Sequence, residues 1–424
     1  MIRPFFYKPE GMSRRDFVRE VTRWGTAIGL SPAVLQTLCA VRTVDAEDAV
    51  EITDVQDTPH EKAPVQLGAN CIEVPKKYYD TVEKNAIRCY ICARNCHLPE
   101  GKTCFCYTRT NRAGKLYSYA FNNPCTFIPD DPVEKGPFFH FMPETKTFSV
   151  AIAGCMLRCA YCQNWEIAQI RPTEAKNYKL DKKEVMARIK NMPVKSFTYT
   201  YTDPIAFFEW MMEMATHAKE NKLKNLMVTS GYIREAPLKE ACQVIDAFCI
   251  TIKGFTEPFY EKVIGGRLQP VLRAIEVVKE QKKWLEIPYL IVPTYNDGMA
   301  EIKEMCKWVV KNCGTETPVH FARFKPSYKM KNLPEGAIKV LENARKVGLD
   351  CGLKFVYIAN VPGHAGNNTL CPNCKKVVIN RVGFKVIDEL DGRGEVIKPR
   401  ALDILMQRNG ACKFCGKKVP GVWV

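Results

Sequence analysis

A short loop with three cysteines constrains this chain more than any other stretch of its sequence. Cys155, Cys159 and Cys162 follow the apolar run 147–153 with C-x₃-C-x₂-C spacing. Three thiolates on one loop can ligate three irons of a cubane [4Fe–4S] cluster and leave the fourth iron without a protein ligand. A small chelating cofactor can bind at that open iron. Structural zinc loops use cysteine pairs and four ligands in all, so this spacing favours a cluster over zinc.

With Tyr161 before its third cysteine, the loop resembles the signature of radical S-adenosylmethionine (SAM) enzymes. The resemblance implies that the open iron binds the amino and carboxylate groups of SAM. It also implies that an electron from the cluster splits SAM into methionine and a 5′-deoxyadenosyl radical. Such a chain needs a low-potential electron donor as a partner.

The composition suits a globular enzyme with bound metals. The chain has 424 residues, which is long for one ordinary domain but suits one α/β barrel with additional segments. Its twenty cysteines lie mostly in short-spaced groups, which indicates metal sites and not a disulfide framework. The net charge of +16 favours anionic partners, but lysines are spread over many predicted helices, which favours a solvated basic surface. We therefore do not expect nucleic acid as a partner.

The N-terminus resembles an export signal. Residues 13–19, Ser-Arg-Arg-Asp-Phe-Val-Arg, are close to the twin-arginine pattern, and residues 24–41 carry no charged side chain. We predict a leader over residues 1–46, a linker over residues 47–84 and export to the periplasm. The alternatives are an amphipathic N-terminal helix and a cytoplasmic protein, because SAM is supplied in the cytosol.

A second cysteine group occupies a predicted Cys-rich segment, residues 85–146. It consists of Cys89, Cys92, Cys96, Cys104 and Cys106. Four of these thiols can surround zinc or an auxiliary iron–sulfur cluster. We choose Cys106 over Cys104 as the fourth ligand, because its longer reach lets the turn at Gly101 fold back. A structural role and a redox role are equally compatible with the spacing.

The third cysteine group lies in a predicted C-terminal module, residues 366–424. It consists of two Cys-x₂-Cys pairs, Cys371 with Cys374 and Cys412 with Cys415. Two such pairs are typical of a four-cysteine zinc or rubredoxin-like iron site that joins two hairpins. We prefer a structural zinc to an electron relay.

Strand and helix patterns alternate through residues 147–365, which is typical of βαβ units and a parallel sheet. The predicted strands are 147–153, 196–201, 225–230, 246–253, 285–292, 317–322 and 353–358. The predicted helices are 182–191, 205–221, 236–244, 268–281, 299–313 and 335–347. We predict an α/β fold with a partial (β/α) barrel of the TIM type, whose site lies at the C-terminal ends of the strands.

Residues from about 85 to 424 resemble the AmmeMemoRadiSam-system radical SAM enzymes, which are relatives of pyruvate formate-lyase activating enzyme. The matching segments are 88–92, 154–155, 162–164, 199–204, 253–255, 265–268, 320, 323–324, 328–330, 361–364 and 370–374. The resemblance implies a [4Fe–4S] cluster on the three loop cysteines. It also implies SAM contacts from Thr202, Asp203, Lys253 and His320. The chain departs from the family at Asp203, where Glu is usual, and at Thr251, where Asp is usual.

The same side chains also have structural interpretations. Asp203 and Pro204 can begin a helix as its N-cap and first residue. His320, beside an apolar strand, can be a core histidine. Lys253 is costly to bury without an anionic partner, which favours a function for it.

We therefore expect a radical SAM enzyme that abstracts a hydrogen atom from a substrate in the barrel mouth. The sequence does not identify that substrate. One alternative is a glycyl-radical-enzyme activase, whose substrate is a partner protein. Two alternatives from other classes are an exported iron–sulfur electron-transfer protein and a basic metal-ribbon protein that binds nucleic acid.

Overall fold

The computed structural model describes residues 70–178, 181–382, 385–387, 389–390, 396–398, 406 and 409–423. All of them belong to one unit that begins at Ile52. The predicted leader, residues 1–46, lies outside the described residues.

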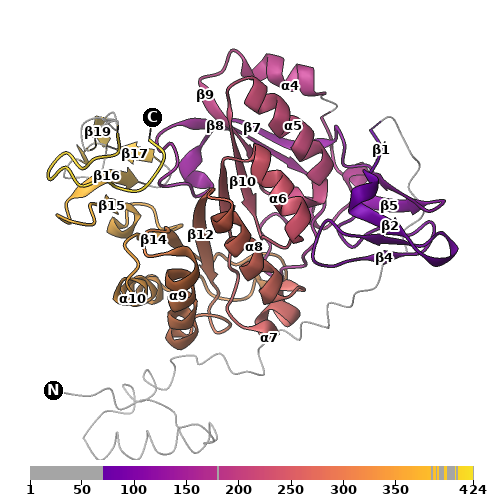
Figure 1. Ribbon diagram of the computed structural model, residues 1–424. Helices are drawn as coiled ribbons and strands as arrows, with labels where there is room; N and C mark the ends of the chain where they lie inside the picture. The colour runs from indigo at the N-terminus through magenta and orange to yellow at the C-terminus, as the bar shows by residue number, and fades with distance from the viewer. Residues whose placement is uncertain are drawn as a thin grey trace, which may run out of the picture. The chain divides into compact units, whose positions relative to one another are not determined.

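One mostly parallel sheet forms the centre of this unit (Figure 1). Its strands are β7 (Pro124–Pro132), β8 (Lys146–Ile152), β9 (Val194–Tyr199), β10 (Lys224–Thr229), β11 (Ala247–Ile250), β12 (Trp284–Ile291), β13 (Val319–Arg323) and β14 (Val356–Ala359). They lie in the order β14-β13-β12-β11-β10-β9-β8-β7, and only β7 runs antiparallel to its neighbour. Strands β7 and β14 are the two edges of the sheet, so backbone pairing does not close it into a complete barrel.

Helices cover one face of the sheet. They are α4 (Lys182–Ile189), α5 (Phe208–Glu220), α6 (Glu235–Val244), α8 (Leu268–Glu280), α9 (Met299–Cys313) and α10 (Ile338–Asp350). In α8, Leu268, Val271, Leu272 and Ile275 follow helical spacing and are all buried, which explains why this segment packs on the sheet. The predicted alternation of strands and helices is confirmed.

On the other face of the sheet, the chain between β7 and β8 packs against β10 and β11. We call residues 133–142 the inner segment. It begins with a 3₁₀ turn (η4, Val133–Lys135), and its apolar side chains Phe138, Phe141 and Met142 are buried in a cluster with Leu226 of β10. The periodic patterns of the sequence predicted neither a strand nor a helix for residues 133–142.

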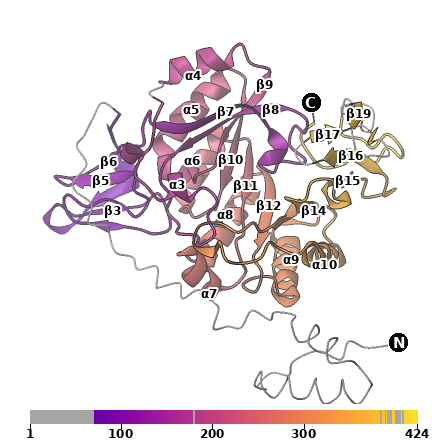
Figure 2. The same cartoon turned by 180° about the vertical axis from the view of Figure 1, so that it is seen from behind.

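Two smaller parts flank the main sheet (Figure 2). In the N-terminal part, one sheet contains β1 (Ile72–Glu73), β5 (Arg109–Arg112) and β6 (Lys115–Ser118), and another contains β2 (Tyr79–Thr81), β3 (Ile87–Cys89) and β4 (His97–Leu98). Strands β1 and β2 lie within the predicted linker and pair with the Cys-rich segment. The C-terminal part contains β15 (Thr369–Leu370), β16 (Val377–Val382), β17 (Lys385–Ile387), β18 (Glu389–Leu390) and β19 (Val396–Lys398).

Candidate active site and metal centres

A loop after strand β8 carries the three cysteines of the C-x₃-C-x₂-C motif, and we call residues 154–164 the cluster loop. Because β8 and β9 are parallel, this loop lies at the edge where the parallel strands end. The N–H groups of Arg158 and Ala160 donate to the carbonyl oxygens of residues 264 and 263, each at 2.9 Å. The backbone around the three thiols is therefore held in place from that side.

The N-terminal part contacts the cluster loop from another side. A Cβ atom added at Gly154 would lie 2.6 Å from the carbonyl oxygen of Cys106, and the φ of +107° also favours glycine there. The ring of Phe105 lies 3.4 Å from the guanidinium of Arg94 and 3.8 Å from that of Arg158, measured to the ring centroid. The chain around the second cysteine group thus packs directly on the cluster loop.

The loop thiols fit a cluster better than a single ion. Burial raises the pKa of Cys155, Cys159 and Cys162, to about 11 for Cys162, which favours the protonated thiols. Because a metal binds thiolates, these groups release protons when they ligate it. Within the described ranges, only the four C-terminal cysteines have their ligand atoms all within 4.8 Å of one another. The loop carries only three cysteines, one fewer than a tetrahedral zinc site needs, and this number matches the three protein ligands of a cubane cluster with one open iron.

Lys253, just after β11, is a cation beside these thiols. Burial lowers the pKa of Lys253, but the negative charge of Cys159, Cys162 and Cys155 outweighs burial and raises it. Its ammonium makes no hydrogen bond or ion pair with the described part of the chain. This ammonium is suited to an anionic group of a bound ligand.

Asp203 uses its hydrogen bonds within the protein. One carboxylate oxygen accepts the N–H of Ile205 at 3.2 Å and the hydroxyl of Thr229 at 2.8 Å. The other accepts the N–H of Ser230 at 2.8 Å and its hydroxyl. The N-cap interpretation of Asp203 is confirmed, and the same carboxylate ties the loop after β9 to the loop after β10.

Tyr161 of the cluster loop and Thr202, which follows β9, are both buried. The Thr202 hydroxyl donates to the carbonyl of Ile152 at 2.6 Å, which joins the ends of β8 and β9. The Tyr161 hydroxyl has no partner among the described residues. An unpaired buried hydroxyl costs about 1–3 kcal/mol, which a bound ligand would recover.

His320 lies in β13 and is fully buried. Its Nε2 bonds the carboxylate of Glu286 at 2.8 Å, and its ring stacks on that of Tyr357 with 5.0 Å between centroids. Its Nδ1 has no partner among the described residues. This packing agrees with the core-histidine interpretation except at Nδ1.

Glu286 of β12 is a central residue that the sequence analysis missed. Its fully buried carboxylate accepts the backbone N–H of Phe139 at 3.0 Å, that of His140 at 2.8 Å and the indole N–H of Trp284 at 3.0 Å. Burial opposes its ionisation, but the interactions with His320 and His140 together outweigh burial and lower the pKa of Glu286. An acidic residue within the apolar pattern 285–292 was the available signal.

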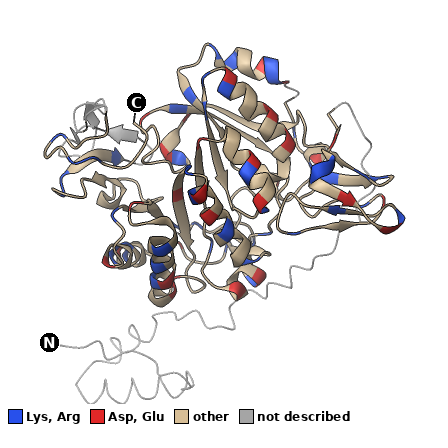
Figure 3. Cartoon of the chain, in the orientation of Figure 1, with Lys and Arg blue, Asp and Glu red and all other residues tan. Residues whose placement is uncertain are grey.

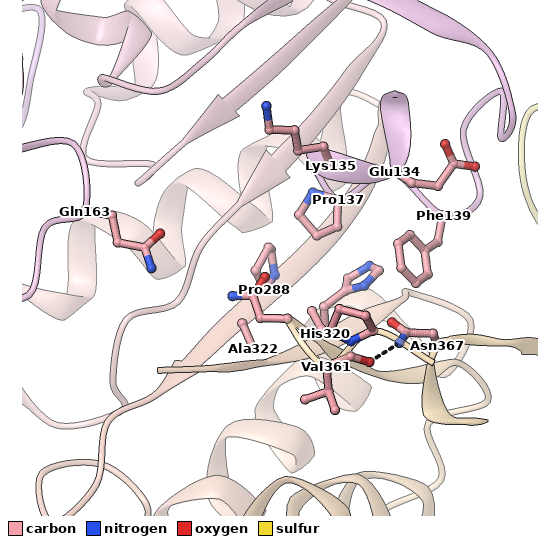
Figure 4. Close-up of a pocket in the computed structure, with 13 residues that line it drawn as sticks. Glu134, Lys135, Pro137, Phe139, Gln163, Pro288, His320, Ala322, Val361 and Asn367 are labelled. Atoms are coloured by element: carbon pink, nitrogen blue, oxygen red, sulfur yellow. Dashed lines mark hydrogen bonds between the residues drawn. The ribbon is translucent and has the colours of Figure 1, made fainter. Parts of the chain in front are cut away.

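A cavity of about 350 Å³ lies between the inner segment and the ends of β13 and β14 (Figure 4). It is lined by Glu134, Lys135, Pro137, Phe139, Gln163, Pro288, His320, Ala322, Ala359, Asn360, Val361, Pro362 and Asn367. Gln163 belongs to the cluster loop and approaches from the side opposite Phe139. The cavity has the size of a small-molecule site and adjoins the predicted cluster.

The five N-terminal cysteines gather at one place. The thiol of Cys104 interacts with those of Cys89, Cys96 and Cys106, and Cys92 is buried beside the same group. The Sγ of Cys106 lies 3.6 Å from a guanidinium nitrogen of Arg109. Both Cys104 and the predicted fourth ligand Cys106 therefore belong to the group.

The four C-terminal cysteines come together as predicted. The sulfur atoms of Cys371 and Cys415 are 3.6 Å apart, and those of Cys374 and Cys412 are 3.7 Å apart. A tetrahedral zinc ion with bonds of about 2.3 Å needs sulfur atoms about 3.8 Å apart, so this group fits one ion. Each close pair combines one cysteine from each Cys-x₂-Cys motif.

The surface charges are mixed along the helices. Figure 3 shows Lys and Arg interspersed with Asp and Glu on the helices that cover the sheet. On α8, Arg273 pairs with Glu276 and Glu280 and also with Glu235 of α6. No described helix has the length and apolar character that a membrane span requires.

Comparison with known proteins finds a superfamily match and two uncharacterized relatives. The pattern of the radical SAM superfamily matches residues 149–309. The uncharacterized protein MJ0808 of Methanocaldococcus jannaschii is 40% identical over 344 residues, which are 81% of this chain and 97% of that protein. A second uncharacterized protein of that organism, MJ0674, is 21% identical over 220 residues, which are 48% of this chain and 63% of that protein.

Two solved structures are similar to this chain at low sequence identity. A domain of a pyruvate-formate lyase-activating enzyme from Bacteroides vulgatus has a TM-score of 0.35 and 13% identity, over 38% of this chain and 98% of that domain. Streptococcus suis SuiB bound to S-adenosylmethionine has a TM-score of 0.41 and 13% identity, over 54% of this chain and 53% of SuiB.

Proposed function

The chain belongs to the radical SAM superfamily, and from this we propose that it cleaves SAM reductively at a [4Fe–4S] cluster held by Cys155, Cys159 and Cys162. The observation that carries the proposal is the set of three thiols on one loop, one buried and two half-buried, beside the unpaired ammonium of Lys253. The bound cluster and SAM supply the 5′-deoxyadenosyl radical, and the protein supplies positions and excludes water.

The proposed roles of the other residues follow from their contacts. Lys253 holds the SAM carboxylate, and Tyr161 donates its free hydroxyl to the bound cofactor. Thr202 and Asp203 shape the same site indirectly, because their hydrogen bonds fix the loops after β8, β9 and β10. The substrate enters the cavity beside Gln163, where a hydrogen atom is abstracted. The proposed subtype is the AmmeMemoRadiSam-system enzyme, and the substrate is unassigned.

The proposal is tested by anaerobic reconstitution with iron and sulfide, reduction, and addition of SAM. We expect 5′-deoxyadenosine from the parent protein and none from Cys159→Ala. The matched control is Cys249→Ala, which removes a buried thiol from β11 and leaves the loop intact. A cluster visible by spectroscopy without any nucleoside would contradict the proposal and favour electron transfer without SAM.

We also propose that residues 1–46 direct export by the twin-arginine route. A fusion of these residues to a folded reporter tests this. Reporter activity in the periplasm, lost when Arg14 and Arg15 are both changed to Lys, is the expected result. A reporter that stays in the cytoplasm would favour a cytoplasmic enzyme.

A further inference from the structure

The inner segment forms one wall of the cavity, and the sheet holds it from one side. Phe138, Phe141 and Met142 pack against β10 and β11 in one buried cluster. The Glu286 carboxylate accepts the N–H groups at positions 139 and 140. These contacts leave the ring of Phe139 at the border of the cavity, 4.8 Å from the ring of His320 between centroids.

The C-terminal tail holds the inner segment from the other side. The N–H of Met142 donates to the carbonyl of Val422 at 2.7 Å, and the N–H of Val422 donates to the carbonyl of His140 at 2.8 Å. The two segments approach so closely that a Cβ atom at Gly421 would lie 2.6 Å from the carbonyl oxygen of His140. This tail follows directly on the second cysteine pair.

The hairpin of the first cysteine pair contacts the same segment through Arg381 of β16. This fully buried guanidinium donates to the carbonyl of Phe139 at 2.8 Å and lies 4.2 Å from the centroid of the Phe139 ring. It also donates to the Thr369 hydroxyl at 2.8 Å. Arg381 therefore connects β15 and β16 to the wall of the cavity.

The sulfur contacts cross between the two cysteine pairs, and both pairs adjoin the contacts just described. An ion bound by all four thiolates would join the hairpin that carries Arg381 to the tail that carries Val422. Small metal modules depend on such an ion for their folded form. Without it, these two supports of the inner segment lose the cross-link between the cysteine pairs and keep the apolar cluster that contains Ile379 and Val419.

We propose that the ion bound by Cys371, Cys374, Cys412 and Cys415 positions the wall of the substrate cavity. It does so by clamping residues 137–142 between the C-terminal module and the sheet. The ion is a divalent metal that accepts four thiolates, zinc or iron, and it takes no part in the reaction. The inference rests on the proposed function only in treating this cavity as the substrate site.

Hydrogen exchange of the full-length, cluster-loaded protein tests the inference without turnover. In Cys415→Ser, which removes an exposed ligand, we expect loss of the C-terminal ion and exchange about tenfold faster in residues 137–142. Exchange in β9 and the absorbance of the cluster should stay unchanged. The matched control Lys413→Ser changes an exposed neighbour in the same motif. It should keep the C-terminal ion and leave exchange in residues 137–142 unchanged.

Gly421→Val disturbs the contact between the tail and the inner segment without removing a metal ligand. It tests the proposal even if Cys415→Ser fails to fold or keeps its ion. The added side chain collides with the carbonyl of His140 and with the ring of Trp423 in the tail, so residues 137–142 should exchange faster while the ion stays bound. Unchanged exchange in Gly421→Val, or in Cys415→Ser after loss of the ion, would overturn the proposal. Formation of 5′-deoxyadenosine by the parent protein reports the proposed function separately.

Discussion

Lys253 brings an unpaired positive charge next to the three thiols of the cluster loop. If it binds the SAM carboxylate, Lys253→Met removes a charge-assisted hydrogen bond worth about 1.5–3 kcal/mol. We expect the KM for SAM to rise about tenfold or more, with the iron content unchanged. Initial rates of 5′-deoxyadenosine formation at varied SAM concentration measure this effect.

The control for this prediction is Lys262→Met, which removes an exposed lysine from the neighbouring short helix. It should leave the KM unchanged. A KM in Lys253→Met equal to that of the parent would assign the SAM carboxylate to another residue.

Glu134 gives the stability of the fold a pH dependence. Burial raises the pKa of Glu134 from 4.5 to about 7, although Arg381 partly opposes the rise. The folded state therefore binds more protons than the unfolded state between these values. Stability from this group is complete below about pH 4.5 and declines as the pH rises through about 7, by about 3 kcal/mol at most.

Glu134→Gln should remove this decline, because the amide carries no charge at any of these pH values. Urea denaturation at pH 5, 6, 7 and 8, with equal metal loading, compares the parent and the variant. Glu166→Gln changes an exposed carboxylate and should follow the parent. Parallel stability curves for the parent and Glu134→Gln would contradict the assignment.

At the scale of elements, the end of β8 requires a glycine. Gly154 has φ +107°, and its missing side chain admits the carbonyl of Cys106. Gly154→Ala combines an unfavourable backbone conformation with a collision, so we expect a loss of about 2 kcal/mol or more. The cluster loop should shift as well, and iron bound per chain after reconstitution should fall.

Gly298→Ala is the matched control, because no atom lies within 4 Å of the added Cβ and its φ is −68°. Iron analysis and thermal unfolding of both variants are sufficient. Full iron content and parental stability in Gly154→Ala would mean that the two loops separate at little cost.

Most elements of the main sheet could be predicted because each strand or helix carries its own periodic signal. The predicted helix 299–313 matches α9, and the predicted strand 285–292 is offset by one residue from β12. The inner segment carries no such signal, since its apolar residues are buried by partners distant in sequence. Glu286 could be noticed as an acid in an apolar strand, but its partners at positions 139 and 140 depend on the fold.

In the candidate site too, contacts between residues distant in sequence could not be predicted. The cysteine groups were predictable because metal ligation imposes short spacings that a sequence displays directly. The bonds of Asp203 to Thr229 and Ser230 were not, because they join the ends of two parallel strands. Spacing thus indicated which cysteines form groups, whereas the tertiary partners of the other site residues came only from the structure.

At the scale of the whole molecule, a buried ion pair fastens the N-terminal part to the main sheet unit. Arg109 of β5 donates to both carboxylate oxygens of Glu209 of α5, at 2.7 and 2.8 Å, and to the carbonyl of Ile205 at 3.1 Å. Both side chains are almost inaccessible, with 2% and 4% exposure. The same guanidinium lies beside the thiol of Cys106, so this fastening adjoins the second cysteine group.

Removing one partner should therefore be costly, because the other remains as an uncompensated buried charge. We expect Arg109→Met to lower the free energy of unfolding by about 3–5 kcal/mol and Glu209→Leu to act similarly. The double variant should lose less than the sum of the two, because it buries no charge. Denaturation of the parent, the two single variants and the double variant under anaerobic conditions gives the coupling energy between the two side chains.

The control Lys346→Met breaks an exposed pair with Asp350 and should cost less than about 1 kcal/mol. Additive losses at Arg109 and Glu209 would mean that the ion pair between them contributes no coupling energy to the stability of the protein.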